Sequence, residues 1–167
     1  LKEDIGKGDI TTKLFISEYK KAQAVIIAKE KGIVCGIDIA KLVFKLLDRK
    51  IRFSSLLKDG DMLNKGKIVA RLHGSISSIL TGERVALNFL GFLSGIATRT
   101  KEFVSKVKFC NVKLLDTRKT IPGLRELQKY AVRVGGGFNH RLCLDEMILI
   151  KENHIKVMGL KDVTERI

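Results

Sequence analysis

The class of fold is most readily inferred from residues 112–154, which read VKLLDTRKTIPGLRELQKYAVRVGGGFNHRLCLDEMILIKENH. Residues 112–116 form a short apolar run of strand length that ends abruptly in polar TRKT, and residues 146–151 do the same before ENH. Between them, residues 124–132 have the apolar spacing of a helix. A strand, a polar loop, a helix and a second strand make the unit of a parallel α/β sheet or barrel. We therefore predict an α/β protein whose functional residues lie just beyond the C-terminal ends of the two strands.

Basic side chains follow both predicted strands. Arg118 and Lys119 come after the first strand, Arg141 lies in the NHR segment, and Lys151 ends the second strand. If the two strands are neighbours, their ends lie roughly 5 to 10 Å apart, because adjacent strands are about 4.8 Å apart. Like charges held so close raise the free energy unless an anion lies between them. We therefore expect these cations to converge on a substrate with several negative charges.

The same cations could instead be neutralised within the protein. Acidic residues such as Asp116, Glu146 and Glu152 could each pair with one of them. Pairing of all four cations is much less expected than pairing of one. Arginine suits carboxylate and phosphate groups through two parallel N–H donors, and lysine acts as a mobile point charge. An anion site is therefore the favoured interpretation.

Three glycines and two histidines lie in the same region. Residues 135–137 are all glycine, which suits either a tight connection or a close approach to a phosphate, and no GxGxxG pattern distinguishes the two. His140 and His154 lack metal-ligand spacing with each other or with a cysteine, so a zinc site is not expected. We assign His140 to the anion site. For His154 a structural cap is an equally good interpretation.

The first 110 residues have the pattern of a mixed α and β unit. Short strands are predicted at residues 10–12 after a turn, at residues 25–28, at residues 33–35 and within the turn-rich residues 51–74. From Ile37 the apolar residues recur every three or four positions, which predicts a helix that ends near Asp48. Residues 75–107 have the same periodicity with Gly91 and Gly95 in it, and we expect two helices that meet near Gly95.

Composition excludes several classes of protein. A hydrophobic content of 45% is enough for a real core, so disorder is not expected. A formal charge of +14, from 32 Lys and Arg against 18 Asp and Glu, favours polyanionic partners or small anionic substrates. Cys35, Cys110 and Cys143 are too few and too far apart for a disulfide framework, which indicates reduced thiols and a cytoplasmic protein. We find no apolar span of membrane length and no signal peptide, so neither a membrane nor a secreted protein is expected.

Three segments carry a family resemblance. EDIGKGDITT, GERVALNFLGFLSGIAT and the stretch from LLDTRKT to LIKENHI occur in this order at residues 3–12, 82–98 and 114–155. Together they resemble the quinolinate phosphoribosyltransferases, also called nicotinate-nucleotide pyrophosphorylases. The resemblance implies an N-terminal α/β sandwich domain, residues 1–110, and an open α/β barrel from residue 111 to 167. It also implies condensation of quinolinate with phosphoribosyl pyrophosphate, with Mg²⁺ as cofactor, to give nicotinate mononucleotide for NAD biosynthesis, CO₂ and pyrophosphate.

The resemblance also implies which residues form the site. The residues implied to line the substrate pocket are Thr117, Arg118, Lys119, His140, Arg141 and Lys151. Lys119 and Lys151 are the expected catalytic residues among them. Arg84 of GERVALN is implied to reach the pocket of a neighbouring subunit, which makes a homodimer or higher homo-oligomer the expected assembly. No residue is assigned as a metal ligand.

The resemblance stops before a complete barrel. Family members continue well past LIKENHI with strands and loops for ribose, metal and phosphate, and an eight-stranded barrel needs about 250 residues. We therefore expect residues 111–167 to form an incomplete barrel and the sequence to be part of a longer polypeptide. A truncated, non-catalytic fragment is one alternative, and a molybdate-operon paralogue of uncertain substrate is another.

A nucleic-acid-binding module would also explain the basic charge. Such a module is expected to interleave surface aromatic residues with cations. Only ten aromatic residues occur, two Tyr and eight Phe, and they show no such pattern. Nucleic acid is therefore not an expected partner.

Overall fold

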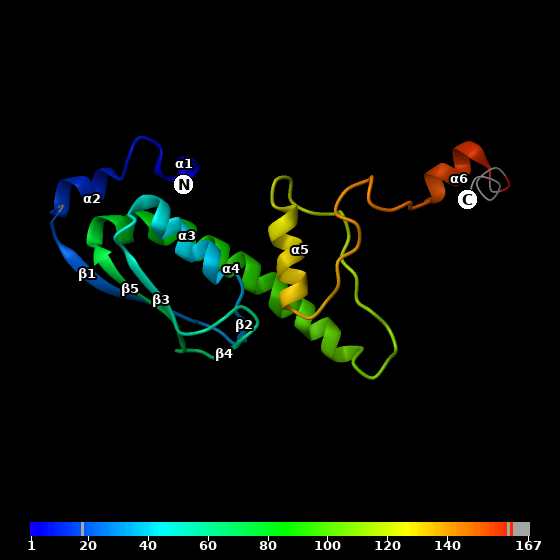
Figure 1. The fold of residues 1–167 in the computed structure, drawn as a ribbon, viewed down its shortest axis with the longest axis horizontal. Helices are drawn as coiled ribbons and strands as arrows, with labels where there is room; N and C mark the ends of the chain where they lie inside the picture. Colours follow the sequence, from blue (N-terminus) through cyan, green and yellow to red (C-terminus); the bar gives the residue numbers. More distant parts are fainter. Residues whose placement is uncertain (18, 160, 162–167) are drawn as a thin grey trace.

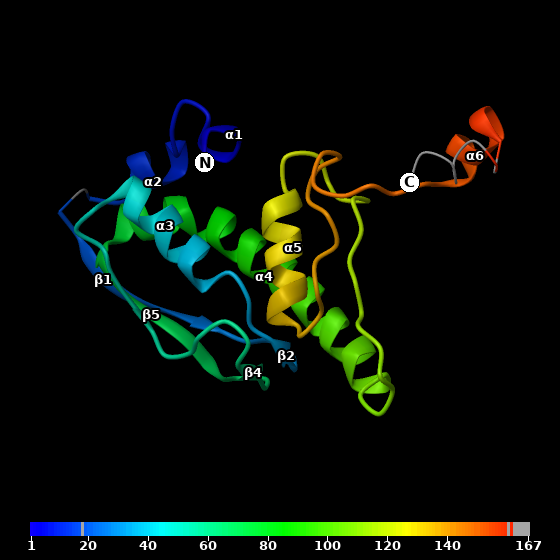
Figure 2. The same ribbon diagram turned by 45° about the vertical axis from the view of Figure 1, so that its right-hand side comes forward.

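The computed structural model describes residues 1–17, 19–159 and 161, which form a mixed α/β fold around one long helix (Figure 1). The helices are α1 (Lys2–Ile5), α2 (Ile10–Phe15), α3 (Ile37–Leu47), α4 (Ile76–Lys106), α5 (Arg125–Val134) and α6 (Glu152–Met158). The strands are β1 (Lys21–Ile27), β2 (Gly32–Ile33), β3 (Arg52–Ser55), β4 (Met62–Leu63) and β5 (Ile68–Ser75). Helix α4 runs from the sheet to the C-terminal part of the molecule, where α5 crosses it (Figures 1 and 2).

The larger sheet has the strand order β1-β5-β3, and both pairs are antiparallel. Alternation along β1 leaves Ala24 and Ile26 half-buried toward the core, whereas Val25 and Ile27 are exposed on the other face. Strands β2 and β4 form a separate antiparallel pair. The strand predicted at residues 25–28 and the mostly β character predicted for residues 51–74 are therefore confirmed.

Helices α3 and α4 pack together on one face of the larger sheet (Figure 2). Helix α3 ends at Leu47 as the apolar periodicity from Ile37 predicts. Its buried residues Val43 and Phe44 join Leu72 of β5 in the main core. Full burial of one such aliphatic or aromatic side chain contributes about 1.5–3 kcal/mol. This core fixes the position of α4, which in turn carries the site-bearing part of the chain.

Asp59 caps α3 from a distant loop. The helix follows Gly36, which has φ 99° and no capping side chain. The Asp59 carboxylate accepts hydrogen bonds from the backbone N–H groups of Gly36 at 2.9 Å and Ile37 at 3.0 Å. A negative charge at a helix N-terminus is stabilised by the helix dipole. The same carboxylate accepts a bond from the hydroxyl of Tyr130 on α5, so it ties α5 to this layer.

Helix α4 is continuous from Ile76 to Lys106, so the expectation of two helices that meet near Gly95 is wrong. A Cβ at Gly91 or Gly95 would meet no atom within 4 Å, so neither glycine serves a close helix contact. A glycine in a helix interior costs about 1 kcal/mol relative to alanine. Burial of Leu93 and Ala97 beside them outweighs that cost, because each packs in a core cluster with α5.

The length and apolar character of α4 differ from the expectation that no segment could span a membrane. Among the described residues it is the one helix long and apolar enough to do so by length and composition. The sequence-based expectation is therefore not met on that criterion. The buried residues of α4 face the sheet, α3 and α5, which is the packing of a core helix.

The strand predicted at residues 10–12 is absent, because these residues begin α2. The carboxylate of Asp9 accepts hydrogen bonds from the backbone N–H of Thr12 at 2.9 Å and from its hydroxyl at 2.5 Å. This is the geometry of a helix N-cap. The bond from the Thr12 side chain is the main reason that the pKa of Asp9 is lowered. A local capping bond thus outweighs the β preference of the threonines.

The chain after α4 forms the predicted helix but, in the described residues, no regular strand. Helix α5 is confirmed close to the predicted residues 124–132 and packs on α4. Residues 112–116 make a single parallel bridge, between Leu115 and Phe138. The neighbour of this run is therefore the segment directly after α5, and the condition considered from the sequence, that residues 146–151 form a neighbouring strand, is not met among the described residues. No closed barrel is present among the described residues.

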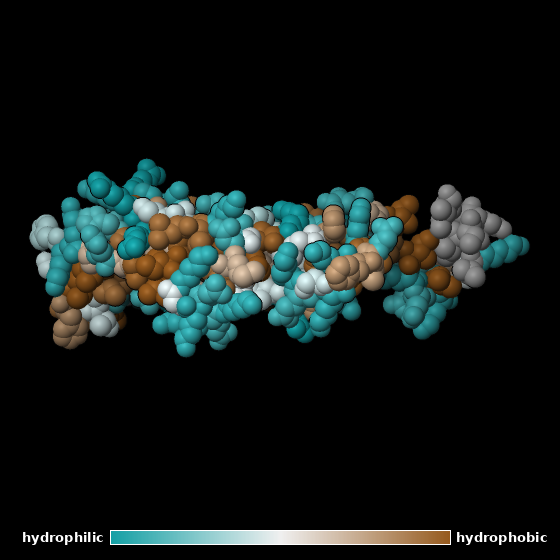
Figure 3. All heavy atoms as spheres, turned by 90° about the horizontal axis from the view of Figure 1, so that it is seen from below, coloured by the Kyte–Doolittle hydropathy of each residue, from teal (hydrophilic) through white to brown (hydrophobic). Residues whose placement is uncertain are grey.

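The run at residues 146–151 forms no strand and has no strand beside it in the described chain. Its backbone makes none of the evenly spaced bonds that a parallel strand needs. Met147 and Ile148 are consequently 52% and 82% exposed. Figure 3 shows apolar atoms on the surface both over the sheet and toward this C-terminal end. Apolar character alone therefore does not make this run a strand here.

The three consecutive glycines form a tight connection between α5 and the following segment. A Cβ at Gly135 would lie 2.5 Å from the carbonyl oxygen of Ala97 and 2.6 Å from Cβ of Thr100, both on α4. Gly136 has φ 90°, a conformation that other residues rarely adopt. Of the two interpretations left open by the sequence, close packing of the backbone against α4 is the one that the structure shows.

Candidate anion-binding site

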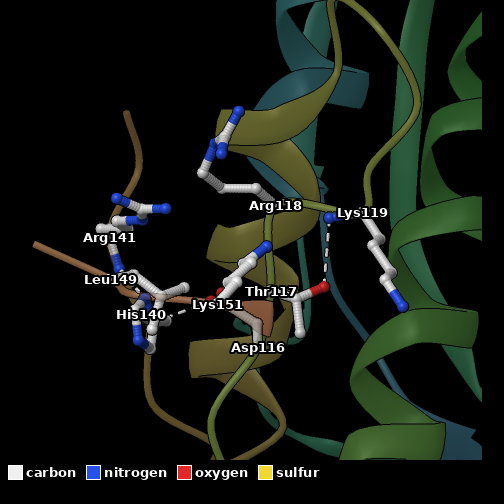
Figure 4. A pocket seen from close by; sticks show the side chains of 8 residues that line it. All are labelled: Asp116, Thr117, Arg118, Lys119, His140, Arg141, Leu149 and Lys151. Atoms are coloured by element: carbon white, nitrogen blue, oxygen red, sulfur yellow. Dashed lines mark hydrogen bonds between the residues drawn. The ribbon is translucent and has the colours of Figure 1, made fainter. Parts of the chain in front are cut away.

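One pocket of about 440 Å³ contains six of the seven predicted site residues (Figure 4). It is lined by Asp116, Thr117, Arg118, Lys119, His140, Arg141, Leu149 and Lys151. Three separate segments contribute these residues: the loop after residues 112–116, the segment after Phe138, and the run before α6. The four basic residues thus line one pocket, although the second expected strand is not formed and their charged ends point in different directions (Figure 4).

Arg118 has the clearest unused donor in the pocket. Its Nε atom is buried and has no hydrogen-bond partner in the described part of the chain. The two ion pairs found among the described residues are Arg99–Glu102 and Lys129–Asp116, and neither includes a basic residue that lines the pocket. A buried donor without a partner costs about 1–3 kcal/mol. The pocket therefore favours an acceptor group beside Arg118.

Arg141 lines the pocket and also makes a structural hydrogen bond. Its residue is 8% exposed, and one terminal nitrogen donates to the carbonyl of Met147 at 2.7 Å. This bond ties residue 147, four positions before Lys151, to the segment that carries Arg141. The Nε atom of Arg141 is buried without a partner, as in Arg118. Part of this guanidinium thus serves the structure, and its Nε donor is left without a partner among the described residues.

Thr117 and Lys119 shape the loop after the first run. The hydroxyl of Thr117 accepts a bond from the backbone N–H of Lys119 at 3.1 Å. Figure 4 shows the Lys119 side chain extending to the opposite side of Thr117 from His140 and Arg141. Lys119 therefore lines the pocket from a different side than the arginines, where it could contact a second part of a ligand.

The two predicted histidines have different environments. Nδ1 of His140 accepts a bond from the backbone N–H of Arg141 at 2.8 Å, which orients the ring at the pocket wall. Nδ1 of His154 accepts a bond from the backbone N–H of Lys151 at 2.9 Å, at the start of α6. The interpretation of His154 as a structural cap is therefore confirmed. His140 lies in the pocket, and its role there stays a prediction.

Lys129 was not assigned from the sequence, yet it forms the buried ion pair of the site. Its Nζ lies 2.5 Å from Oδ1 of Asp116, and the two side chains are 2% and 8% exposed. The same nitrogen donates to the backbone carbonyl of His140 at 2.8 Å. Asp116 was considered as a partner for a pocket cation. It pairs instead with a lysine outside the lining set.

The sequence pattern gave no signal for Lys129. The apolar residues of α5 recur at positions 124, 127, 131 and 134, and Leu127, Ala131 and Val134 pack against α4. At 3.6 residues per turn, position 129 lies on the opposite side of the helix. Periodicity therefore places Lys129 in solvent. It is buried because the segment that follows α5 folds back over that side.

Arg84 lies apart from the pocket. It is exposed on α4 and is not among the lining residues. Its implied contact with the site of a neighbouring subunit stays a prediction.

Metal ligation has little support in the described residues. No group of three or more His, Cys, Asp and Glu side chains among them could hold a metal ion. The carboxylate of Asp116 is already occupied by Lys129. The residues described here therefore do not fit a Mg²⁺ site of their own, and we derive no step through the metal.

The fold is that of a mixed α/β protein, and its pocket is lined by four basic residues. Two family models match the chain: "Quinolinate phosphoribosyl transferase, N-terminal domain" over residues 9–94 and the C-terminal domain of the same family over residues 96–167. The chain belongs to the quinolinate phosphoribosyltransferase family.

Known relatives agree with this assignment. The chain is 50% identical over 157 residues to a probable nicotinate-nucleotide pyrophosphorylase (carboxylating) of Bacillus subtilis, which covers 94% of this chain and 54% of that protein. It is 48% identical over 168 residues to the corresponding Methanocaldococcus jannaschii protein, covering 99% and 58%. The chain thus spans little more than half the length of these relatives.

Solved structures show the same fold. NadC from Streptococcus pyogenes superposes with a TM-score of 0.93 at 42% identity, covering 99% of this chain and 60% of that one. The nicotinate-nucleotide pyrophosphorylase from Francisella tularensis superposes with a TM-score of 0.91 at 47% identity, covering 99% and 59%. The mixed α/β fold is therefore that of these enzymes over the part that the chain spans.

Proposed function

We propose that this chain supplies the quinolinate-binding part of a carboxylating nicotinate-nucleotide pyrophosphorylase. The observation that carries the proposal is that four basic residues line one pocket and have no carboxylate partner among the described residues: Arg118, Lys119, Arg141 and Lys151. Such a pocket suits quinolinate, which has two adjacent carboxylates, and phosphoribosyl pyrophosphate, which carries a phosphate and a pyrophosphate.

The arginines are proposed to orient the pyridine ring. The guanidinium groups of Arg118 and Arg141, whose buried Nε atoms have no partner among the described residues, would donate to carboxylate oxygens and so aim the ring nitrogen at the sugar carbon that bears pyrophosphate. The new N–C bond forms as the C–O bond to pyrophosphate breaks, and the electron pair of that bond leaves with pyrophosphate. Lys119 and Lys151 are proposed to stabilise this developing negative charge.

Decarboxylation follows from the charge created by the first step. Bond formation makes the ring a pyridinium, which withdraws electrons from the adjacent carboxylate. The C–C bond to that carboxylate then breaks, CO₂ leaves, and the electron pair remains on the ring carbon, which takes up a proton. The products are nicotinate mononucleotide, CO₂ and pyrophosphate. In this scheme the chain's own residues bind, orient and stabilise charge, and no described side chain forms a covalent bond to the substrate.

The assembly and location are proposed on the same basis. We propose that residues 1–110 form an α/β sandwich domain and that residue 111 begins an open α/β barrel. Arg84 is exposed on α4, which suits its proposed contact with a second subunit of a homodimer. Cys35, Cys110 and Cys143 are free thiols, which suits a cytoplasmic location.

Two measurements on the purified chain test the proposal. Isothermal titration should show quinolinate binding that weakens with added salt, because the contacts are ionic. Incubation with quinolinate, phosphoribosyl pyrophosphate and Mg²⁺ should then release CO₂ and form nicotinate mononucleotide. Absence of quinolinate binding contradicts the proposal.

A second candidate function has one observation in its favour. The chain covers only 54% and 58% of its two curated relatives. Quinolinate binding without product formation would identify the chain as an anion-binding fragment without catalysis. Turnover would exclude that candidate.

A further inference from the structure

We propose that Lys129 keeps the anion pocket positively charged by holding Asp116, the pocket's own carboxylate, in an internal ion pair. The inference rests on the proposed function insofar as it names quinolinate as the anion. Lys129 is not itself proposed to touch the substrate. It positions the carboxylate of Asp116, which would otherwise compete with a ligand carboxylate for the cations of the pocket.

Asp116 is the internal competitor of an anionic ligand. It is the one acidic side chain among the described residues that line the pocket. It directly precedes Thr117 and Arg118, and it shares the pocket with Lys151. A carboxylate released into this pocket would pair with the same cations that a substrate carboxylate needs. The pocket can therefore accept an external dianion only while this group is engaged elsewhere.

Three donors engage the Asp116 carboxylate, and none of them comes from the side chains of the four pocket cations. Oδ1 accepts from Nζ of Lys129 at 2.5 Å and from the backbone N–H of His140 at 2.8 Å. With its side-chain amide oriented to satisfy its neighbours, Asn139 donates to Oδ2 at 2.9 Å. Lys129 supplies the only full positive charge among these three donors. Its loss would leave two neutral donors to hold an ionised carboxylate.

The position of Lys129 suits this role. It projects from the side of α5 opposite the apolar stripe, and its side chain is 2% exposed. Through its two bonds, to Asp116 and to the His140 carbonyl, Lys129 links the run that carries Asp116 to the segment that carries Arg141. Buried ion pairs often contribute little net stability, because both charges lose their hydration. Control of the pocket's charge is a function that such a pair can serve at this position.

Two single substitutions separate this role from a structural one. Lys129→Met and Asp116→Asn both break the ion pair, and both are close in size to the residue replaced. Lys129→Met frees a carboxylate, so quinolinate affinity should fall about tenfold or more, which corresponds to about 1.4 kcal/mol. Asp116→Asn removes the competing charge and keeps an acceptor for His140, so quinolinate affinity should be retained or increased. A purely structural pair predicts losses in both variants.

The exposed pair Arg99–Glu102 on α4 provides matched controls. Arg99→Met and Glu102→Gln change the net charge by the same amounts, and neither residue lines the pocket. Each should leave the dissociation constant of quinolinate within about twofold of the unaltered chain, because exposed charges outside the site are screened. Thermal unfolding of every variant reports stability separately from binding.

The double variant Asp116→Asn/Lys129→Met covers the case in which Lys129→Met does not fold. It lacks both charges, so its quinolinate affinity should return to within a fewfold of the unaltered chain. Weakened binding in Asp116→Asn, or a double variant as weak as Lys129→Met, overturns the inference. If Lys129→Met does not fold, the quinolinate affinities of Asp116→Asn and of the double variant, each compared with the unaltered chain, still test the inference.

Phthalate separates failure of this inference from failure of the proposed function. It carries the same pair of adjacent carboxylates on a ring without nitrogen. If the unaltered chain binds phthalate but not quinolinate, the proposed function is wrong, and the variants still test the inference with phthalate. If neither dicarboxylate binds, both proposals are overturned. Opposite effects of Lys129→Met and Asp116→Asn on either ligand support the inference.

Discussion

The hydroxyl of Tyr130 donates a hydrogen bond to the Asp59 carboxylate at 2.8 Å, across 71 residues of sequence. Asp59 caps α3, and Tyr130 belongs to α5, next to Lys129. The bond therefore connects the sheet layer to the helix that carries the buried ion pair. Burial is the main cause of the raised pKa of Tyr130, and the bond to Asp59 adds to it. The neutral phenol is thus the form that the folded chain stabilises.

Replacement of Tyr130 by Phe should destabilise the chain by about 1–2 kcal/mol, because Asp59 loses one of its three donors. The ring and its packing against α4 are retained. Denaturant unfolding should show a lower midpoint with an unchanged slope. The exposed Tyr19 offers a control, since Tyr19→Phe should leave the midpoint unchanged. Equal midpoints for Tyr130→Phe and the unaltered chain would show that the bond contributes nothing.

Stability should decline at alkaline pH through Cys35 and Tyr130. Burial, and to a smaller extent the negative charge of nearby Asp59, raises the pKa of the Cys35 thiol from 9.0 to about 12. Because the folded pKa lies above the unfolded one, the neutral thiol's contribution is complete below pH 9 and is lost as pH rises toward 12. Tyr130 acts in the same direction above pH 10. In Cys35→Ala the free energy of unfolding should fall less steeply between pH 9 and 10.5 than in the unaltered chain. An unchanged slope would contradict this assignment.

Gly135→Ala should destabilise the chain by about 1–3 kcal/mol, the usual range for an overpacked site. Its Cβ would lie 2.5 Å from a backbone oxygen of α4, which cannot move aside as a side chain can. Gly91→Ala is the matched control, because a Cβ there meets no atom within 4 Å inside a continuous helix. That variant should be stabilised by about 0.5–1 kcal/mol. Thermal unfolding of the two variants would show opposite shifts, and shifts of the same sign would contradict the packing described.

Some of the fold follows from sequence pattern, for reasons visible in the structure. Helices α3 and α5 were predicted close to their observed bounds, because each buries one face and the apolar spacing reports it. The continuity of α4 was not predicted. The intrinsic cost of Gly91 and Gly95 is local, whereas the packing that outweighs it comes from segments remote in sequence. The strand expected at residues 146–151 was wrong for a related reason, since a strand requires a partner that a single run does not specify.

The sequence predicted the basic residues that line the candidate pocket. It did not predict the buried ion pair between Lys129 and Asp116. The residues after the run at 112–116 and in the NHR segment lie together because α5 returns the chain beside that run. Lys151 follows Met147 by four residues, and no sequence pattern reveals the bond that ties the Met147 carbonyl to Arg141. Lys129 was missed because helical periodicity assigns its side of α5 to solvent. The ion pair that it forms with Asp116 depends on tertiary structure alone.

Lys119→Ala should sharply depress turnover, by about 100-fold or more, if Lys119 stabilises charge only in the transition state. The side chain is exposed at the pocket edge, so its removal should leave thermal unfolding unchanged. Lys101→Ala, exposed on α4 and outside the pocket, is the control and should retain full turnover. The assay measures kcat for formation of nicotinate mononucleotide. A near-normal kcat in Lys119→Ala would overturn the role proposed for this lysine.

The most direct test of the account is a crystal structure of the chain soaked with quinolinate. If the proposed site is correct, density for quinolinate will lie in the pocket, with one of its carboxylates within hydrogen-bond distance of Nε of Arg118. The ion pair between Asp116 and Lys129 will remain intact. Quinolinate bound on another surface, or an empty pocket at a concentration that saturates binding in solution, would contradict it.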